Sequence, residues 1–385
     1  MNCTNDHDSM QMSNSKQHIS VIRKTRRLAL KVGQYVNRRL LKDSFFARHL
    51  PFRDTLFRLL TPSLNEAEIA SANRQFHEDI IDKRVVQLKA KGAENIKFYI
   101  LLVESLGDIV ACEPICHYLK KIAPNSSITW IVKPKFADIL NAMPLVDKAI
   151  TVNSIAEGFD LCETLAKNPA SVIINCQYDN TFCPITKRVL HNPCNPNVNI
   201  ETYYALGNLL ETFCLTAGLP RLKEAPSLTI DKRMRAAELP EHYIVLHCHS
   251  ADKSRDWTSA GWTSLANWLM GSGHSVVEVG TVKEISSNNS LYFDKSGQRS
   301  ISELLSIIRG ARAFVGIDSG FAHIANAFEV PSVILLGRYS VFDRYFPYSG
   351  VFAHSDLFQC VYAPKGLYTA AIDSETVRET LAHLL

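Results

Sequence analysis

From residue 96 onward, short apolar runs typical of buried strands alternate with amphipathic segments typical of helices. The first run begins at Ile96, ends at Gly107 and Asp108, and leads into a helical pattern that Pro124 closes. Further strands are predicted within 126–134, 148–153, 170–177, 243–249, 274–280, 314–317 and 331–337, and further helices within 136–144, 200–219, 261–273, 300–313 and 321–328. This alternation predicts an α/β protein with two doubly wound parallel sheets, each with a ligand cleft at the carboxyl ends of its strands.

The alternating pattern divides the chain into four predicted parts. Residues 1–95 form a basic, mainly helical extension, and residues 96–230 form the first Rossmann-like domain. Residues 231–371 form the second Rossmann-like domain, after a seam of charge, proline and short apolar runs near 221–240. Residues 372–385 are predicted to be a helix that crosses back to the first domain, which would couple domain closure to ligand binding.

Charge separates the extension from the rest of the chain. Residues 1–95 hold seventeen Lys and Arg against ten acids, whereas the remaining residues hold twenty-five against twenty-eight. Within 19–60, apolar residues recur at helical spacing and the basic residues fall largely on other faces. Such a helix could bind an anionic membrane surface or could dock on its own protein, and both interpretations stay open. No nucleic-acid-binding motif accompanies it.

Composition favours an ordinary globular protein without a structural metal or a disulfide framework. The ten cysteines lack CxxC spacing, so they are predicted to be reduced. The polar start of the chain does not resemble a signal peptide, and no apolar run reaches the length of a membrane span. These features predict a cytoplasmic protein, and the extension would place it on the inner face of the cytoplasmic membrane.

The stretch FVGIDSGFAHIANA, residues 314–327, carries candidate chemistry at a junction of strand and helix. Backbone N–H groups at the start of that helix could bind an anion, and Gly320 would let a phosphate approach the backbone. Alternatively, Asp318 or Ser319 caps the helix and Gly320 makes the turn.

Two separated stretches resemble glycosyltransferase family nine, the ADP-heptose:lipopolysaccharide heptosyltransferases. GIDSGFAHIANAFEVPSVILLG is similar to the donor-site segment of that family, and ILLVESLGDIVACEP is similar to its opening strand, Gly-Asp turn and helix. The resemblance covers roughly residues 96–340. It implies the GT-B fold, in which two Rossmann-like domains face a central cleft, and a nucleotide-sugar donor without a further cofactor.

For the first domain, the resemblance implies that Asp108 is the general base that deprotonates the acceptor hydroxyl, with Gly107 beside it. The alternative is that Asp108 only caps its helix. The acceptor side departs from the family pattern, because Leu102 replaces a basic residue and Glu104 and Glu113 replace small hydroxyl residues. If both glutamates faced the cleft, they would repel a strongly anionic acceptor.

An insertion over 176–199 is a candidate acceptor loop through Lys187 and Arg188. An ordinary surface loop is the alternative explanation.

For the second domain, the resemblance implies a donor site. Ser250 matches a small hydroxyl position, and either Arg255 or Lys253 matches the cation that holds the diphosphate. Glu284 matches an acid near the ribose or the base, with the start of a surface helix as the alternative. The following helix would contribute Asp318 toward the donor sugar, the backbone of Ser319 and Gly320 toward the diphosphate, and His323 one turn further on. No Asp-x-Asp metal clamp is visible, so no catalytic metal is expected.

The sequence therefore predicts an inverting, metal-independent glycosyltransferase that moves heptose or a related sugar onto a cell-envelope glycolipid or glycan. Two alternatives remain open: a nucleotide-sugar epimerase of the same fold, and a family member that binds a nucleotide without catalysis.

Overall fold

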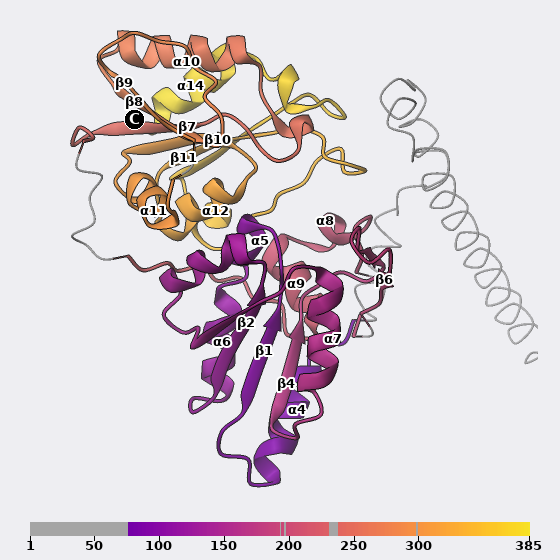
Figure 1. The fold of residues 1–385 in the computed structure, drawn as a ribbon. Coiled ribbons are helices and arrows are strands. Elements are labelled where there is room, and N and C mark those ends of the chain that lie inside the picture. Colours follow the sequence, from indigo (N-terminus) through magenta and orange to yellow (C-terminus); the bar gives the residue numbers. More distant parts are fainter. Residues whose placement is uncertain (1–75, 193, 196–197, 231–237, 298) are drawn as a thin grey trace, which may run out of the picture. The chain divides into compact units, whose positions relative to one another are not determined.

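The computed structural model describes residues 76–385 apart from 193, 196–197, 231–237 and 298. The predicted basic helix within 19–60 lies outside the described residues, and so does the predicted domain boundary at 231. Two parallel sheets with helices on their faces make up the described chain, which confirms the predicted pair of Rossmann-like domains (Figure 1). We call them the first and the second lobe.

The first lobe is built on a four-stranded parallel sheet in the order β3-β2-β1-β4. Its strands coincide with the predicted apolar runs: β1 Lys97–Leu101, β2 Ser127–Val132, β3 Lys148–Thr151 and β4 Ser171–Asn175. Its main helical segments are α5 Leu106–Ala111, α6 Pro114–Ile122, the 3-10 helix η2 Pro134–Ala142 and α7 Ile155–Leu165. The helix predicted over 109–124 is divided between α5 and α6, because Pro114 lacks the N–H that would continue α5.

The second lobe is built on a six-stranded parallel sheet in the order β12-β11-β10-β7-β8-β9. The strands are β7 Tyr243–His247, β8 Ser275–Gly280, β9 Tyr292–Ser296, β10 Ala313–Ile317, β11 Ser332–Leu336 and β12 Phe358–Tyr362. Its helices are α10 Ser259–Gly271, α11 Ile301–Arg309, α12 Gly320–Ala327, α13 Val351–His354 and α14 Ser374–Leu384. The sequence pattern missed β9 and β12, which are the edge strands and carry half-exposed residues instead of a continuous apolar run.

The prediction of a single helix over 200–219 is wrong. The segment forms two helices, α8 Tyr203–Leu206 and α9 Leu209–Ala217, separated at Gly207. Gly207 has φ of 149°, and a Cβ at this position would lie 2.6 Å from Glu211 Oε2. The chain therefore breaks the helical path where only glycine fits. The nearby pair β5 Thr181–Phe182 and β6 Val189–Leu190 forms a small antiparallel hairpin within the insertion.

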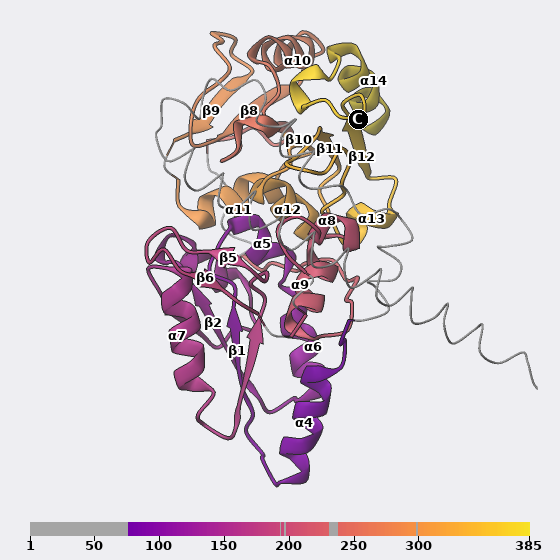
Figure 2. The same cartoon turned by 90° about the vertical axis from the view of Figure 1, so that its right-hand side faces the viewer.

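Both ends of the described chain differ from the predicted partition. Helix α4, Ile80–Ala90, was assigned to the extension but packs beside β4, and its Ile81 N–H donates to Gly218 O at 3.3 Å. Helix α14 was expected to cross back to the first lobe, but it lies against α10, β11 and β12 of the second (Figure 2). Its buried Val377 and Leu381 join the core of the second sheet, which is the apolar surface nearest to them.

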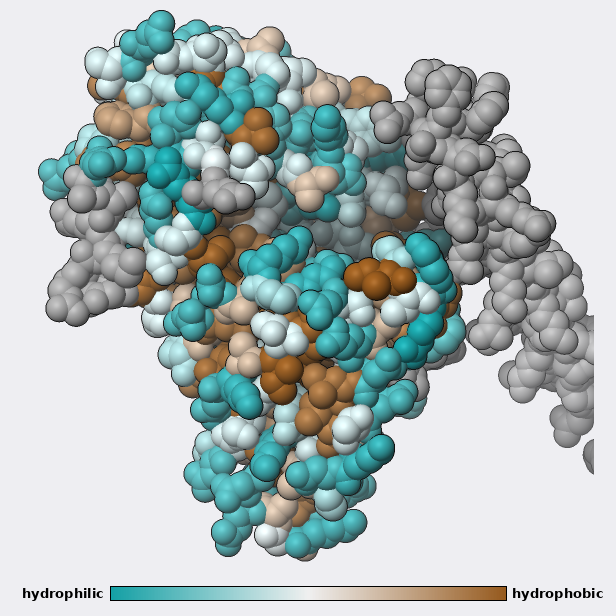
Figure 3. Space-filling view, in the orientation of Figure 1, coloured by the Kyte–Doolittle hydropathy of each residue, from teal (hydrophilic) through white to brown (hydrophobic). Residues whose placement is uncertain are grey.

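The outer surface is mixed in character. On the face shown in Figure 3, hydrophilic residues form most of the margin, and hydrophobic residues gather mainly within the first lobe. Over the described residues, no helix combines the length and the hydropathy that a bilayer crossing requires.

Candidate active site

The site begins where two helices meet end to end across the lobes. Helix α5 follows β1, and helix α12 follows β10, so both start at the carboxyl ends of their strands. A Cβ on Gly107 would lie 3.1 Å from His323 Cδ2, and a Cβ on Gly320 would lie 3.1 Å from Gly107 N. Since these positions have little room for a side chain, glycine permits the close approach of α5 and α12. The turn that ends at Gly320 therefore faces the start of α5 in the first lobe.

Asp108 occupies the third position of α5, and its Oδ2 accepts the backbone N–H of Ser105 at 3.0 Å. The capping role that the sequence left open is thus present. The side chain is half-buried, and this burial raises its pKa to about 6, with nearby Arg255 opposing the rise and Asp318 adding to it. A carboxylate with such a pKa is ionised at neutral pH and is still basic enough to take a proton.

Asp318 and Arg255 form the charged pair of the second lobe. Arg255 lies in the 3-10 helix η3, Lys253–Arg255, and donates to Asp318 Oδ2 at 3.0 Å. Tyr345 donates to the same oxygen at 2.9 Å, and Tyr348 lies 3.5 Å from Asp318 Oδ1. The Arg255 guanidinium also stacks over the ring of Tyr339, at 4.0 Å from its centroid. Asp318 is therefore engaged by the protein on both oxygens, and its clearest role is to fix Arg255.

Electrostatics keep this arginine charged. Burial alone would lower the pKa of Arg255, but the carboxylate of Asp318 and the tyrosines around the guanidinium together outweigh burial and raise that pKa above its ordinary value. Arg255 Nε and Ser319 Oγ are buried and have no hydrogen-bond partner among the described residues. Buried donors are usually paired, so two unpaired donors near the start of α12 fit a site that receives an anionic ligand.

The other donor-side residues lie in loops after β7 and β8. Ser250 Oγ donates to Asp252 O at 2.7 Å and accepts the Asp252 N–H at 3.0 Å, so its hydroxyl belongs to a local turn. Lys253 is exposed, whereas Arg255 is half-buried against Asp318. Of the two cations that the sequence left in competition, Arg255 is the one built into the site.

Glu284 connects to a network that the sequence did not reveal. His249 Nε2 lies 2.6 Å from Glu284 Oε2, and its Nδ1 lies 3.1 Å from Asp256 Oδ2. Asp256 Oδ1 also accepts the N–H of Ser250 at 2.8 Å. Carboxylates only accept hydrogen bonds, so an imidazole that satisfies both must donate from both nitrogens and carry a charge. Burial lowers the pKa of His249, but its two carboxylate partners outweigh burial and raise it overall.

His323 lies one turn into α12 and is almost fully buried. Its ring packs 4.8 Å from the ring of Tyr348, and burial lowers its pKa to about 4. It is therefore neutral at physiological pH and contributes packing against Gly107 instead of charge.

The acceptor-side candidates are not brought together. Glu104 forms an ion pair with Lys133, a cation at the end of β2 that the sequence analysis did not single out. Glu113 is completely buried and accepts the Ser227 N–H at 2.8 Å, so it does not face the site.

Lys187 and Arg188 lie in the exposed turn between β5 and β6. The guanidinium of Arg188 pairs with both oxygens of Asp160 on α7, at 2.9 Å each. Arg188 is therefore occupied by a surface ion pair, and neither residue contacts Asp108 or Asp318 through any interaction recorded among the described residues.

Sequence reasoning missed the residues that support the site, namely His249, Asp256, Tyr345 and Lys133. The aromatic-rich run RYSVFDRYFPY after β11 was the available signal for Tyr345. His249 and Lys133 carried no comparable signal, because Glu284 and Glu104, with which they pair, lie 35 and 29 residues away in the sequence. Among the described residues, no group of three or more His, Cys, Asp and Glu is arranged to hold a metal ion.

Comparison with known proteins gives a consistent picture. A family model described as glycosyltransferase family 9 (heptosyltransferase) matches residues 185–349. Lipopolysaccharide heptosyltransferase 3 of Escherichia coli is 24% identical over 278 residues, which cover 60% of this chain and 80% of the relative.

Two solved structures share the fold. The glycosyl transferase family 9 protein of Veillonella parvula has a TM-score of 0.55 and 18% identity, covering 75% of this chain and 97% of that one. The E. coli heptosyltransferase WaaC with ADP has a TM-score of 0.52 and 17% identity, with the same two coverages. These likenesses confirm the predicted GT-B architecture.

Proposed function

Because the chain belongs to glycosyltransferase family 9, we propose that it is an inverting transferase that moves heptose from ADP-heptose to a lipopolysaccharide-core acceptor. The observation that carries the proposal is the meeting of α5 and α12. This contact places Asp108 near enough to Arg255 and Asp318 for their charges to act on its pKa. The proposed base and the proposed anion site would thus lie next to each other.

The proposed reaction follows from these positions. Asp108 accepts the proton of the acceptor hydroxyl while that oxygen attacks the anomeric carbon of the donor. The bond to the diphosphate breaks on the opposite face, so the configuration inverts. Negative charge develops on the departing diphosphate, and Arg255 together with the N–H groups that open α12 stabilises it. Arg255 Nε and Ser319 Oγ are buried donors without a hydrogen-bond partner among the described residues, which supports this assignment.

We assign the nucleoside end of the donor to the loops after β7 and β8. Glu284 would accept hydrogen bonds from the ribose hydroxyls, and His249 would hold that carboxylate in place from the loop that carries Arg255. The proposal requires no metal ion, since Arg255 and the amide groups supply the positive charge at the diphosphate.

We further propose that residues 19–60 hold the enzyme on an anionic membrane, where a glycolipid acceptor would be found. The test is cosedimentation with phosphatidylglycerol vesicles, comparing the full chain with a variant lacking residues 1–60. Loss of vesicle binding with unchanged turnover on a soluble acceptor supports the proposal. Equal vesicle binding by both proteins favours docking of this segment on the protein itself.

The experiment for the activity incubates the protein with ADP-heptose and, separately, with UDP- and GDP-sugars. Release of ADP and of free heptose from ADP-heptose, through slow transfer to water, is the expected result. Formation of an epimerised nucleotide sugar would instead identify an epimerase. Binding of the donor without any turnover, even with a lipopolysaccharide-core acceptor added, would identify a non-catalytic binder.

A further inference from the structure

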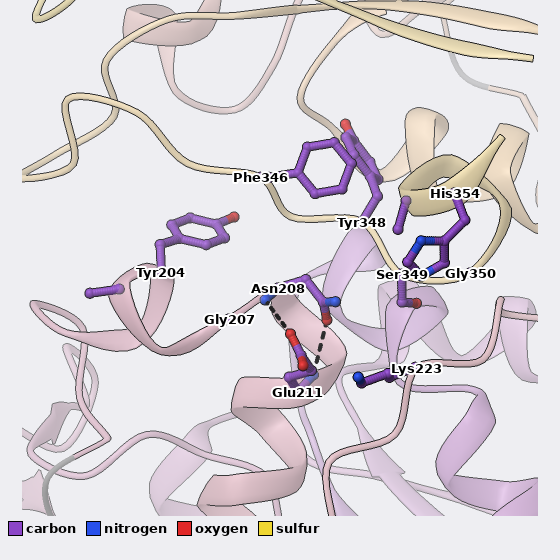
Figure 4. A pocket seen from close by; sticks show the side chains of 12 residues that line it. Tyr204, Gly207, Asn208, Glu211, Lys223, Phe346, Tyr348, Ser349, Gly350 and His354 are labelled. Carbon is purple, nitrogen blue, oxygen red and sulfur yellow. Dashed lines mark hydrogen bonds between the residues drawn. The ribbon is translucent and has the colours of Figure 1, made fainter. Parts of the chain in front are cut away.

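A cavity of about 480 Å³ lies beside the candidate active site, and none of the proposed catalytic or donor-binding residues lines it (Figure 4). One wall comes from the first lobe, where α8 and the start of α9 contribute Tyr204, Asn208 and Glu211. The opposite wall comes from the second lobe, where the segment after β11 contributes Phe346 and Tyr348. The volume is within the range of sites that bind small organic ligands.

The cavity shares two aromatic walls with the active site. The Tyr348 hydroxyl lies 3.5 Å from Asp318 Oδ1, while its ring lines the cavity and packs against His323. The ring of Tyr204 lies 4.5 Å from that of Tyr345, which donates to the other oxygen of Asp318. A ligand in the cavity would therefore be separated from the charged pair by the thickness of one aromatic side chain.

The order of the strands places the cavity away from the nucleoside end of the donor. Glu284 follows β8, Asp318 follows β10, and Phe346 follows β11. In the sheet, β8 and β11 lie on opposite sides of β10. A donor that extends from Glu284 to the start of α12 leaves the cavity for the other substrate, on the side that the first lobe partly encloses.

The polar groups of the cavity are fixed and retain bonding capacity. Asn208 Oδ1 accepts the Glu211 N–H at 3.0 Å, and Glu211 Oε2 accepts the Asn208 N–H at 3.1 Å (dashed in Figure 4). This reciprocal cap uses one oxygen of each side chain, so the amide N–H₂ of Asn208 and the second oxygen of Glu211 remain for a ligand. The exposed ammonium of Lys223 also lines the cavity and makes no ion pair with any described residue.

This mixture matches the chemistry of a sugar. The half-buried rings of Tyr204 and Phe346 can cover the C–H face of a pyranose, and an amide, a carboxylate and an ammonium can bond its hydroxyls. A lipid chain would leave Glu211 and Lys223 without polar partners, at an unfavourable free energy of desolvation.

We propose that this cavity is a saccharide subsite that holds the acceptor sugar next to the unit bearing the attacking hydroxyl. The inference rests on the proposed transferase function and adds to it the place at which the acceptor binds. It assigns acceptor binding to this cavity instead of to Lys187 and Arg188, of which Arg188 is already paired with Asp160.

The test measures binding of methyl heptoside by saturation-transfer NMR, with saturating ADP present. Phe346→Leu removes a ring and keeps apolar packing, and Lys223→Ala removes the ammonium. We expect Phe346→Leu to weaken sugar binding about tenfold and Lys223→Ala to weaken it by about threefold. Leu357→Ala and Lys121→Ala are the matched controls, because they truncate exposed side chains outside the cavity. Thermal melting checks that all four variants are folded.

Binding of ADP-heptose, measured by calorimetry, separates the two proposals. If the wild type binds ADP-heptose but shows no saturable binding of methyl heptoside, or if Phe346→Leu and Lys223→Ala bind it like the controls, the subsite is rejected and the transferase function stands. If the wild type fails to bind ADP-heptose, the proposed function fails. Loss of ADP-heptose binding in Phe346→Leu would also reject the subsite, because it would place that ring in the donor site.

Discussion

The two helix starts that meet at the site are built differently. In the first lobe, the Asp108 carboxylate accepts the Ser105 N–H through Oδ2 and has a raised pKa. In the second lobe, Arg255 is held by Asp318 and stacked on Tyr339, and Asp318 is itself held by Tyr345. A general base needs a carboxylate oxygen that is not already engaged in hydrogen bonds to the protein. Groups that bind an anion, in contrast, work best when neighbouring side chains already hold them in position. The contrast separates the base from the anion site.

The largest effect expected is from Asp108→Asn. Loss of the base should lower kcat by about 10²–10⁴-fold, with affinity for ADP-heptose unchanged within a few-fold. Steady-state kinetics and calorimetry measure both. A loss of donor affinity as large as the loss of kcat would contradict the assignment of Asp108 as the base.

The same variant makes a prediction about stability. The folded-state pKa of Asp108, about 6, exceeds its reference value of 3.8, so its ionisation destabilises the fold as pH rises between these values and by a constant amount above them. Asp108→Asn should therefore be more stable than the wild type above pH 6, by about 1–3 kcal/mol, and equal to it near pH 4. Denaturant unfolding at both pH values checks this. Equal stability at pH 8 would mean that the carboxylate is well solvated.

Arg255→Ala should have the next largest effect. It removes positive charge from the diphosphate and is expected to lower kcat by about 10²–10³-fold. It also leaves Asp318 buried and unpaired, which should reduce the free energy of unfolding by about 3–5 kcal/mol. The double variant Arg255→Met with Asp318→Asn should recover much of that stability without recovering activity. Recovery of both would show that Arg255 serves packing alone.

Gly320→Ala tests the contact that brings the two regions together. The added Cβ would lie 3.0 Å from Leu106 Cβ and 3.1 Å from Gly107 N, so α5 and α12 must shift apart by a few tenths of an ångström. We expect kcat to fall about tenfold, because the base and the anion site are displaced relative to each other. Gly271→Ala is the control, since a Cβ there meets nothing within 4 Å. Equal activity of both variants would show that the contact between α5 and α12 can shift without loss of catalysis.

The smallest effect concerns His249. The groups facing it are Asp256 and Glu284, and nearby His247 has its own pKa lowered to about 4, chiefly by burial. As pH rises through the raised pKa of His249, one hydrogen bond is lost and Glu284 is held less firmly. The KM for ADP-heptose should therefore rise about two- to fivefold in alkaline buffer, through loss of a charge-assisted bond.

His249→Gln should have a raised KM at every pH and lose this dependence, whereas His274→Gln, at the other end of the second sheet, should keep it. The donor itself does not titrate in this range, so the profile reports the protein. An unchanged pH profile in His249→Gln would remove the histidine from donor binding.

Much of the fold follows from local sequence. Eight predicted strands are present, because each buried parallel strand needs its own apolar run. Helix boundaries were less predictable: Gly207 interrupts one predicted helix, and α14 packs on the second lobe instead of the first. Such outcomes depend on which apolar surface is nearest, and that information is not local.

The sequence by itself determined the two sheets, the Gly-Asp turn before α5 and the Asp-Ser-Gly turn before α12. Turn geometry and apolar periodicity depend on residues that are close together in the sequence. Only the tertiary structure decided that Arg255 and not Lys253 is built into the site, that His249 bridges Asp256 and Glu284, and that Glu113 is buried. Those outcomes depend on charge and burial between residues far apart in the chain. Electrostatic interactions act through space, so their partners become known only once the chain is folded.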